Sequence, residues 1–281
     1  MAPSDYSPKH FNITFPAEYV AHVEINRPEK LNAFFEAMWQ ELRVIFNQLS
    51  FDPDVRAILI SGAGPRAFTA GLDVKAAAEG SLGKSGEKKD AARDAVRFRR
   101  HVADFQECIT ALEKCEKPVI SILHGISYGL GIDLSAATDI RYCSADTRFC
   151  VKEVDIGIAA DIGTLTRLPK VVGAFGWVKE VCMTAREFGA QEAKEVGYVN
   201  GVLPTKEAAI AKALEVAKLM AIKSPVAVQS TKELLNYSID HTIAEGLRYT
   251  GVWNSASTQT KDVSLALLSG LEKRTPTFEK L

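Results

Sequence analysis

The sequence lacks an excess of charge of either sign, and its cysteines lack the spacing of a metal site. Its 281 residues include 34 Lys and Arg against 35 Asp and Glu, a formal net charge of −1. Without an overall basic field, the chain is not expected to bind nucleic acid or an anionic membrane surface. The five cysteines form no CxxC pair, and no histidine follows one at a zinc-ligand interval. This pattern predicts buried, reduced thiols and no metal site.

No apolar run is long enough to span a bilayer, and the first sixteen residues lack the apolar core of a signal peptide. Those residues are also too acidic and too broken by proline for a transit peptide. We therefore expect no stable membrane insertion. The ending Glu279-Lys280-Leu281 shares its last two residues with the peroxisomal Ser-Lys-Leu address. This favours a peroxisomal protein bound by an import receptor, with the mitochondrion or the cytosol as alternatives.

Strand-like and helix-like segments alternate along the first three quarters of the chain. Short apolar runs that predict strands occupy residues 19–26, 57–61, 119–123 and 139–144. Between the first two runs, apolar side chains recur at three- and four-residue steps from Phe35 to Leu49, as on one face of a helix. This alternation predicts an α/β fold with a largely parallel sheet. From about residue 206 the strand signals stop, and helices are predicted at 207–222, 225–237 and 243–253.

The glycine-rich, charged middle of residues 75–100 predicts a flexible surface loop. It contains Gly83-Lys84-Ser85, which matches the end of a phosphate-binding loop. The glycine that such a loop requires five residues earlier is Ala78, and no strand leads into the segment. A nucleotide-hydrolysing enzyme is therefore excluded.

Two glycine-bearing turns are candidates for a functional site. They are Phe68–Asp73 and His124–Asp133, the second of which lies between a predicted strand and a predicted helix. Small residues allow the backbone to pass close to another group, and a helix start offers free N–H donors. Brought together, the two turns would supply the pair of backbone donors that an oxyanion hole requires. Taken alone, each turn is better explained by glycines that end a strand and allow tight packing.

Several motifs, in order and in register, resemble the crotonase (enoyl-CoA hydratase/isomerase) superfamily. They are Ile25–Ala33, Ala67–Asp73, Lys117–Ile120, His124–Leu134 and Ala137–Arg141, with Ser224–Ala227 and Lys273–Phe278 towards the end. The resemblance implies a spiral of ββα turns over residues 11–204. It implies a carboxy-terminal helical region over residues 205–281 that covers the site and forms homo-oligomers, either trimers or dimers of trimers. It further implies an acyl-CoA thioester substrate, so that coenzyme A is part of the substrate and no cofactor is expected.

By motif position, the resemblance implies that the thioester oxygen accepts hydrogen bonds from the backbone N–H groups of Leu72 and Leu130. The family usually has glycine at the second place, so the shape of the pocket beside Leu130 is expected to differ. Ala70 matches a backbone contact to the adenine, and Lys30 lies where coenzyme A approaches. Lys30, Ala70 and Leu72 are therefore expected to contact coenzyme A.

Acidic residues distinguish between the activities that this fold hosts. Hydratases have glutamates at the places of Asp133 and Glu153, and a small residue at the place of Asp161. The combination of Asp133, Glu153 and Asp161 is similar to the Δ3,5-Δ2,4-dienoyl-CoA isomerases and implies that these residues are catalytic. That reaction moves a proton from C2 to C6 through a dienolate that two amides stabilise, and it requires a pair of proton-transfer groups. We assign Glu153 to C2 and Asp161 to C6.

Each of these acids also has a structural explanation. Asp161 precedes a predicted helix and suits an N-cap. Glu153 could pair with Lys152 or Arg141. At a helix start, Asp133 is favoured by the helix dipole and either acts directly or tunes the pKa values of the other two. Three further acids are interpreted as structural: Asp73, Asp139 and Asp155.

Two alternative functions stay open. Within the enzymes, the chain could be a 2-enoyl-CoA hydratase or a simple enoyl-CoA isomerase. In another class, it could be a crotonase-fold binding protein without catalytic activity, since some members bind RNA or act as scaffolds. The presence of all three acids and both glycine turns argues against this last possibility.

Overall fold

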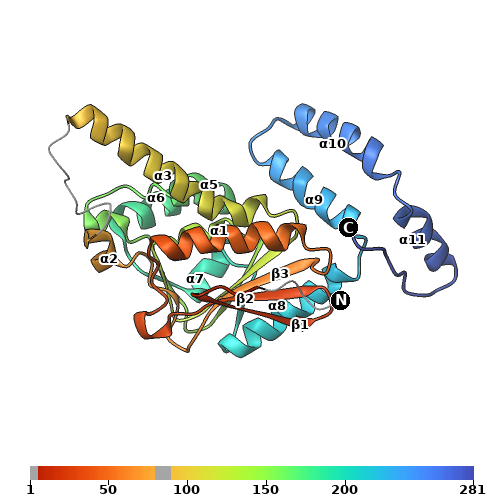
Figure 1. Ribbon diagram of the computed structural model, residues 1–281, viewed down its shortest axis with the longest axis horizontal. Coiled ribbons are helices and arrows are strands. Elements are labelled where there is room, and N and C mark those ends of the chain that lie inside the picture. The colour runs from red at the N-terminus through yellow and green to blue at the C-terminus, as the bar shows by residue number, and fades with distance from the viewer. Residues whose placement is uncertain (1–5, 80–89) are drawn as a thin grey trace.

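The fold is built on two β-sheets, and the computed structural model describes residues 6–79 and 90–281 (Figure 1). Within these residues the larger sheet has the strand order β1 (Phe11–Ala17), β2 (Val20–Ile25), β3 (Ala57–Gly62), β5 (Val119–Leu123), β7 (Ile140–Ser144), β10 (Gly201–Leu203). The smaller sheet has the order β4 (Ala67–Thr69), β6 (Ile126–Tyr128), β8 (Arg148–Cys150), β9 (Phe188–Gly189). Neighbouring strands are parallel except in the pairs β1–β2 and β8–β9.

The chain passes repeatedly from the larger sheet to the smaller one, from β3 to β4, β5 to β6 and β7 to β8. The helical segments that follow these pairs are α2 (Val74–Glu79) and α3 (Ala91–Lys114), then α4 (Leu130–Ala136), then η2 (Glu153–Ile156), α5 (Thr164–Val171) and α6 (Phe175–Thr184). Every residue of β3 and β5 is buried, as expected for parallel strands that are covered on both faces. The predicted α/β fold and the spiral of ββα turns are therefore confirmed.

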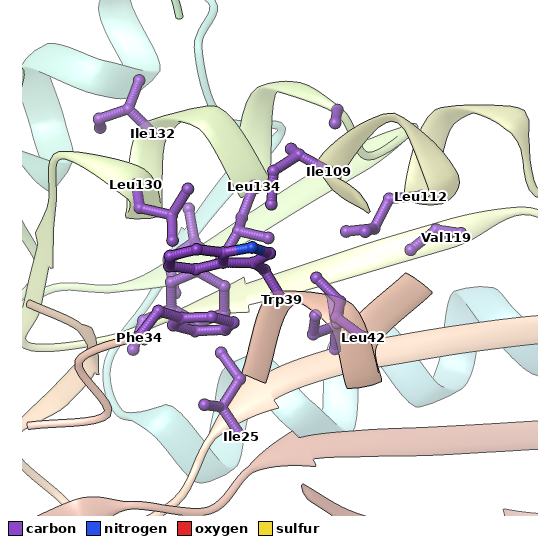
Figure 2. Close-up of a cluster of buried hydrophobic side chains, with 14 of the residues drawn as sticks. Ile25, Phe34, Trp39, Leu42, Ile109, Leu112, Val119, Leu130, Ile132 and Leu134 are labelled. Atoms are coloured by element: carbon purple, nitrogen blue, oxygen red, sulfur yellow. The ribbon is translucent and has the colours of Figure 1, made fainter. Parts of the chain in front are cut away.

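Helices α1 (Glu36–Phe51) and α3 cover one face of the larger sheet. The apolar stripe predicted for the first helix is its buried face, formed by Met38, Leu42, Ile45 and Leu49. Figure 2 shows Trp39 of α1 among Phe34, Leu130 and Leu134. Burial of this stripe holds α1 against α3. Trp39 lies beside Leu130 at the start of α4, which follows one of the two glycine turns.

Helix α8 (Lys206–Ala221) covers the opposite face of the same sheet. Ile58 and Ile60 of β3 belong to the core under α1, whereas Ala57 and Leu59 face α8. The helix presents four fully buried alanines at four-residue steps, Ala209, Ala213, Ala217 and Ala221. Because alanine side chains are short, the helix can lie close to the sheet. The predicted boundary between residues 204 and 205 thus separates β10 from a helix that packs on the same sheet.

The last three helices, α9 (Pro225–Ser238), α10 (Ile243–Ser257) and α11 (Asp262–Leu271), extend away from the sheets (Figure 1). Thr242 and Glu245 form a capping box at the start of α10, which stabilises this end of the helix. The predicted helices at 225–237 and 243–253 are confirmed, and α11 was not predicted. Large apolar side chains are exposed on these helices, namely Leu235, Ile243, Leu247, Val252, Val263, Leu267, Leu268 and Leu271.

Several short elements were not predicted from the sequence. They are β1, β10, the strands of the smaller sheet, η1 (Pro28–Lys30) and α7 (Ala190–Glu195). The ends of the segment 75–100 are helical, because α2 continues to Glu79 and Asp90 caps α3 by accepting a hydrogen bond from the Arg93 N–H. Its predicted loop, with Gly83-Lys84-Ser85, lies outside the described residues. None of the described helices is both long and apolar enough to cross a membrane.

Candidate active site

A pocket of about 470 Å³ lies where α1 and α3 meet the two glycine turns and the segment that joins η2 to α5. Its lining includes the three acids singled out in the sequence, Asp133, Glu153 and Asp161. Leu72 and Leu130, the expected backbone donors, line the same pocket. The fold therefore brings together residues that are up to about ninety positions apart in the sequence.

The two glycine turns lie directly against each other. Gly71 has a φ of 95°, and a β-carbon at this position would lie 2.9 Å from the Tyr128 carbonyl oxygen and 3.5 Å from the Leu130 nitrogen. A side chain is therefore excluded both by the backbone conformation and by the second turn. The close contact places the residue after Gly71 next to the residue after Gly129, as an oxyanion hole requires.

The backbone N–H groups of Leu72 and Leu130 are available as donors. Gly71 and Asp73, on either side of Leu72, both pair with Phe34, through the Gly71 carbonyl and the Asp73 N–H. Leu130 is the first residue of α4, where an N–H has no partner inside the helix. Within the described part of the chain, neither N–H donates a hydrogen bond to another protein group.

Gly129 connects the second turn to Glu153. It precedes α4 with φ 51° and ψ −115°, a conformation that residues with side chains rarely adopt. A β-carbon at Gly129 would lie 3.1 Å from Glu153 Oε1. The Glu153 carboxyl group therefore lies against the turn that carries the Leu130 N–H.

Glu153 is the first residue of η2 and is half-buried. Its Oε2 atom is buried and has no hydrogen-bond partner among the described residues. The pKa of Glu153 is raised to about 7. Burial is the main cause, and the negative charge of Asp133 is the second. A carboxyl group with this pKa can both accept and release a proton near neutral pH.

Asp133 lies on α4 and is only 2% exposed. Its Oδ1 atom accepts hydrogen bonds from the Thr164 N–H at 2.6 Å and from the Thr164 hydroxyl at 2.7 Å. Burial raises the pKa of Asp133 to about 6, although these two hydrogen bonds oppose the shift. Because Thr164 is the first residue of α5, Asp133 acts as a cap for that helix from another element of the chain.

Asp161 lies in the segment between η2 and α5. Its backbone carbonyl accepts a hydrogen bond from Gln106 Nε2 at 2.5 Å. Burial raises the pKa of its carboxyl group, and the charge of His101 acts in the opposite direction. The N-cap interpretation of Asp161 is wrong, because the residue before α5 is Gly163 and no side chain at that position caps the helix.

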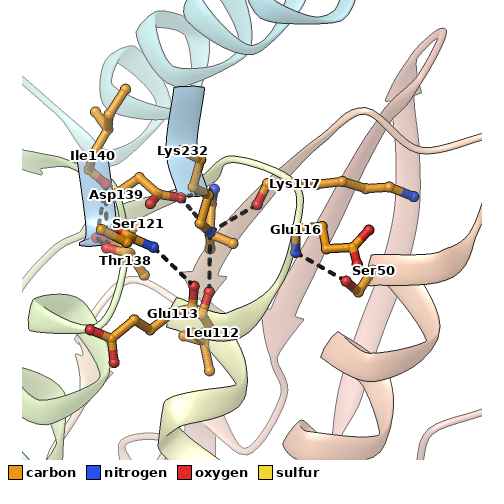
Figure 3. A network of polar contacts seen from close by, with 12 residues as sticks. Ser50, Leu112, Glu113, Glu116, Lys117, Ser121, Thr138, Asp139, Ile140 and Lys232 are labelled. Atoms are coloured by element: carbon orange, nitrogen blue, oxygen red, sulfur yellow. Dashed lines mark hydrogen bonds and ion pairs between the residues drawn. The ribbon is translucent and has the colours of Figure 1, made fainter. Parts of the chain in front are cut away.

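The acids interpreted as structural each have a cationic partner. Lys152 Nζ lies 2.5 Å from Asp155, Arg27 Nη1 lies 2.8 Å from Asp73, and Lys232 Nζ lies 2.9 Å from Asp139. Figure 3 shows the last pair inside a network of polar contacts.

The suggested ion pair of Glu153 with Lys152 or Arg141 is not formed. Lys152 pairs with Asp155. The Arg141 guanidinium donates to backbone carbonyls, including that of Tyr198 at 2.7 Å. Glu153 is thus left without either of the cations that could have neutralised it.

The apolar wall of the pocket was not identified from the sequence. Phe98, Val102 and Phe105 line it from α3. Trp39 of α1 stacks on Phe105, with ring centroids 3.9 Å apart. The signal is the spacing of four and then three residues along α3, which places the three side chains on one face of that helix.

The residues expected to contact coenzyme A lie at or beside this pocket. Ala70 and Leu72 line the pocket itself. Lys30 lines a neighbouring cavity of about 410 Å³. Leu72, Val74 and Ala76 line both cavities, so the two are adjacent. Within residues 6–79 and 90–281, no group of three or more His, Cys, Asp or Glu side chains is arranged to hold a metal ion.

Comparisons with known proteins agree with this architecture. The profile of the enoyl-CoA hydratase/isomerase family matches residues 17–280. The chain is 45% identical to the mitochondrial Delta(3,5)-Delta(2,4)-dienoyl-CoA isomerase of Homo sapiens, over 99% of this chain and 84% of that protein. It is 40% identical to the peroxisomal Delta(3,5)-Delta(2,4)-dienoyl-CoA isomerase of Arabidopsis thaliana, with 93% of each chain covered.

Among solved structures, the fold matches an enoyl-CoA hydratase from Bacillus anthracis with a TM-score of 0.86 and 29% sequence identity. That match covers 96% of this chain and 99% of the other. The similarity in sequence and in fold extends over nearly the whole chain, which therefore belongs to the enoyl-CoA hydratase/isomerase family.

Proposed function

We propose that the protein is an isomerase that converts a 3,5-dienoyl-CoA into a 2,4-dienoyl-CoA, a step in the β-oxidation of unsaturated fatty acids. The observation that carries the proposal is the grouping of Asp133, Glu153 and Asp161 around one apolar pocket, beside two available backbone N–H groups. Two relatives that are 45% and 40% identical to this chain over the aligned residues are named for this activity.

In the proposed mechanism, the thioester oxygen accepts hydrogen bonds from the N–H groups of Leu72 and Leu130. Ionised Glu153 removes a proton from C2, and the electron pair of that C–H bond is delocalised into a dienolate. The two N–H groups stabilise the charge that develops on the oxygen. A carboxyl group of Asp161 then gives a proton to C6, which leaves double bonds at C2 and C4. The raised pKa of each acid suits this exchange near neutral pH.

The enclosed setting of the acids supports proton transfer rather than hydration. Trp39 and the apolar face of α3 form one wall of the pocket, and an apolar wall limits the access of water to a dienolate. Contacts of Lys30, Ala70 and Leu72 with coenzyme A are part of the proposal, as is the absence of any cofactor beyond the coenzyme A of the substrate.

The absorbance of the conjugated diene tests this function directly. Incubation with a 3,5-dienoyl-CoA should produce the absorbance of the 2,4-diene that is conjugated with the thioester. Hydration of a 2-enoyl-CoA without any isomerisation of the diene would instead support the hydratase alternative. If neither substrate is turned over but acyl-CoA still binds, the protein is a binding protein.

We also infer assembly into trimers or dimers of trimers through the carboxy-terminal helices. The support is the set of apolar side chains exposed on α9, α10 and α11, such as Leu247 and Leu267, because apolar patches of this kind mark interaction surfaces. Light scattering coupled to size-exclusion chromatography gives the mass of the assembly, and a monomer at micromolar concentration would contradict the inference.

For the compartment, we propose the peroxisome, with the mitochondrion as the alternative, since relatives are named for each. The ending Glu279-Lys280-Leu281 supports the peroxisome. Lys280 is ion-paired with Asp54 in the structure, so an import receptor would have to displace this contact. Imaging fusions that are tagged at either end, with and without these three residues, distinguishes the two compartments.

A further inference from the structure

The turn that carries Asp161 is held on one side by Asp133. Thr164 ends this turn and is fully buried. Its N–H and its hydroxyl both donate to Asp133 Oδ1, at 2.6 Å and 2.7 Å. A charged acceptor strengthens such hydrogen bonds, and two donors on one oxygen fix the position of the carboxylate.

On the other side, the turn is held by α3. Gln106 Nε2 donates to the Asp161 carbonyl at 2.5 Å. Arg167, one helical turn after Gly163, donates to Glu113 Oε2 at 2.6 Å and to the Thr110 hydroxyl at 2.9 Å. The segment 161–164 is thus clamped between α3, which lines the apolar wall, and α4, which carries the second glycine turn.

We propose that Thr164 is a positioning residue for the isomerisation. Its two hydrogen bonds to Asp133 fix the turn that carries Asp161, and they also fix the Asp133 carboxylate, whose charge acts on Glu153. This inference rests on the proposed function, since it assigns a role within the same site. Thr164 does not touch the reacting atoms in this account. It acts on Asp161 through the backbone of the turn and on Glu153 through the charge of Asp133.

The second effect has a direction that can be measured. The hydrogen bonds of Thr164 favour ionised Asp133, and the charge of Asp133 in turn raises the pKa of Glu153. Without the hydroxyl, Asp133 keeps its proton to a higher pH, so that Glu153 loses a negative neighbour and ionises at a lower pH. Asp161 and Arg167 also act on this pair from neighbouring elements. Burial, together with the charges of the pair, in turn raises the pKa values of Cys150, Cys182 and Tyr198, which face it from other elements.

The test compares Thr164→Val, which keeps the shape of the side chain but removes the hydroxyl, with Thr164→Ser, which keeps the hydroxyl. Thr147→Val is the matched control, because Thr147 is also buried and its hydroxyl also donates a hydrogen bond, to the Ser144 carbonyl at 2.7 Å. The ionisation of Glu153 is followed in the full-length protein by NMR with glutamate labelled at the carboxyl carbon, and Glu153→Gln assigns the signal. This readout needs no substrate.

For Thr164→Val we expect the pH at the midpoint of Glu153 ionisation to fall by roughly half a pH unit to one pH unit. We also expect kcat to fall about tenfold, with KM within about twofold of that of the unmodified protein. Thr164→Ser and Thr147→Val should keep the midpoint of the unmodified protein. An unchanged midpoint in Thr164→Val, or an equal shift in Thr147→Val, would overturn the inference. If Thr164→Val does not fold, Asp133→Asn should lower the same midpoint, and no change in that variant would also overturn it.

Failure of the proposed function gives a different result. In that case the unmodified protein does not isomerise a 3,5-dienoyl-CoA, whatever the NMR titrations of the variants show. A shift in the Glu153 midpoint together with an inactive unmodified protein would retain the coupling of Thr164 to the acids and remove only the assigned reaction.

Discussion

Two groups of enclosed charged side chains in this molecule have opposite surroundings. Beneath α9, the Nζ atom of Lys232 contacts Asp139 at 2.9 Å and the Lys117 carbonyl at 3.1 Å (Figure 3). Lys117 Nζ in turn donates to the Leu49 carbonyl at 2.8 Å. In the pocket, by contrast, Asp133 is bound by an uncharged threonine. One oxygen of Glu153 has no partner among the described residues.

Burial alone does not separate these two groups. It lowers the pKa of Lys117 to about 8 and raises the pKa of Glu153 to about 7, so both regions oppose the charged form. The difference lies in the partners. Backbone carbonyls and an opposite charge hold the lysines beneath α9 in place, which suits attachment of the last helices to the core. The acids of the pocket are left able to exchange protons.

The largest expected effect tests the pocket side of this comparison. Asp161→Asn and Glu153→Gln keep the shape of each side chain but remove its ability to carry a proton. We expect each to lower kcat by about 10²–10⁴-fold, the usual contribution of a positioned proton-transfer group. The measurement is the rate of diene isomerisation, with the mass of the assembly as a control. Turnover by Asp161→Asn within about threefold of the unmodified protein would contradict its assignment to C6.

The next effect tests the region beneath α9. Lys232→Met leaves Asp139 enclosed without its cation, and we expect it to lower the free energy of unfolding by about 3 kcal/mol. Urea unfolding measures this loss. The matched control is Lys212→Met on α8, where Lys212 and its partner Glu215 are both exposed, so that the loss should be much smaller. Equal losses in the two variants would remove the proposed contrast between enclosed and exposed pairs.

The pH dependence of stability tests whether Glu153 is ionised at a cost to folding. Because the pKa of Glu153 is raised from 4.5 to about 7 in the folded protein, its ionised form opposes folding. The cost is absent below the unfolded pKa, grows between the two values and is complete above about pH 7. Glu153→Gln removes this cost. We therefore expect it to increase the free energy of unfolding, and the gain at about pH 8.5 should exceed that at about pH 5.5 by about 1–2 kcal/mol. A gain that is the same at both pH values would show that ionisation of Glu153 does not lower the free energy of unfolding.

The sequence predicts the four inner strands of the larger sheet well and the smaller sheet poorly, for a physical reason. β3 and β5 are continuous apolar runs because both of their faces are buried, and such runs can be recognised without a structure. β4, β6 and β8 have three residues each and β9 has two. Strands this short show no periodicity, so their pairing follows only from the tertiary fold.

The candidate site was likewise predicted in part and missed in part. The order of the motifs was sufficient to single out three acids that line one pocket. The capping of α5 by Asp133 was not predicted, because Thr164 is 31 residues away in the sequence and the contact depends on how α4 and α5 pack. The apolar face of α3 was also missed. Phe98 lies between Arg97 and Arg99, so the charges hid a spacing that becomes clear only once the helix is placed.

The smallest expected effect concerns Asp155, which lies two residues after Glu153 on the same short helix. Asp155 and its partner Lys152 are 45% and 50% exposed, with their charged atoms 2.5 Å apart. Ion pairs this exposed contribute little, so Asp155→Asn should change the free energy of unfolding by less than about 0.5 kcal/mol and kcat by less than about twofold. Urea unfolding and the diene assay measure both quantities. Glu153 and Asp155 share one helix and one type of charge, and they differ in burial and in whether a cation is paired with them. A large loss of activity in Asp155→Asn would therefore mean that a position on η2 is enough to make an acid catalytic.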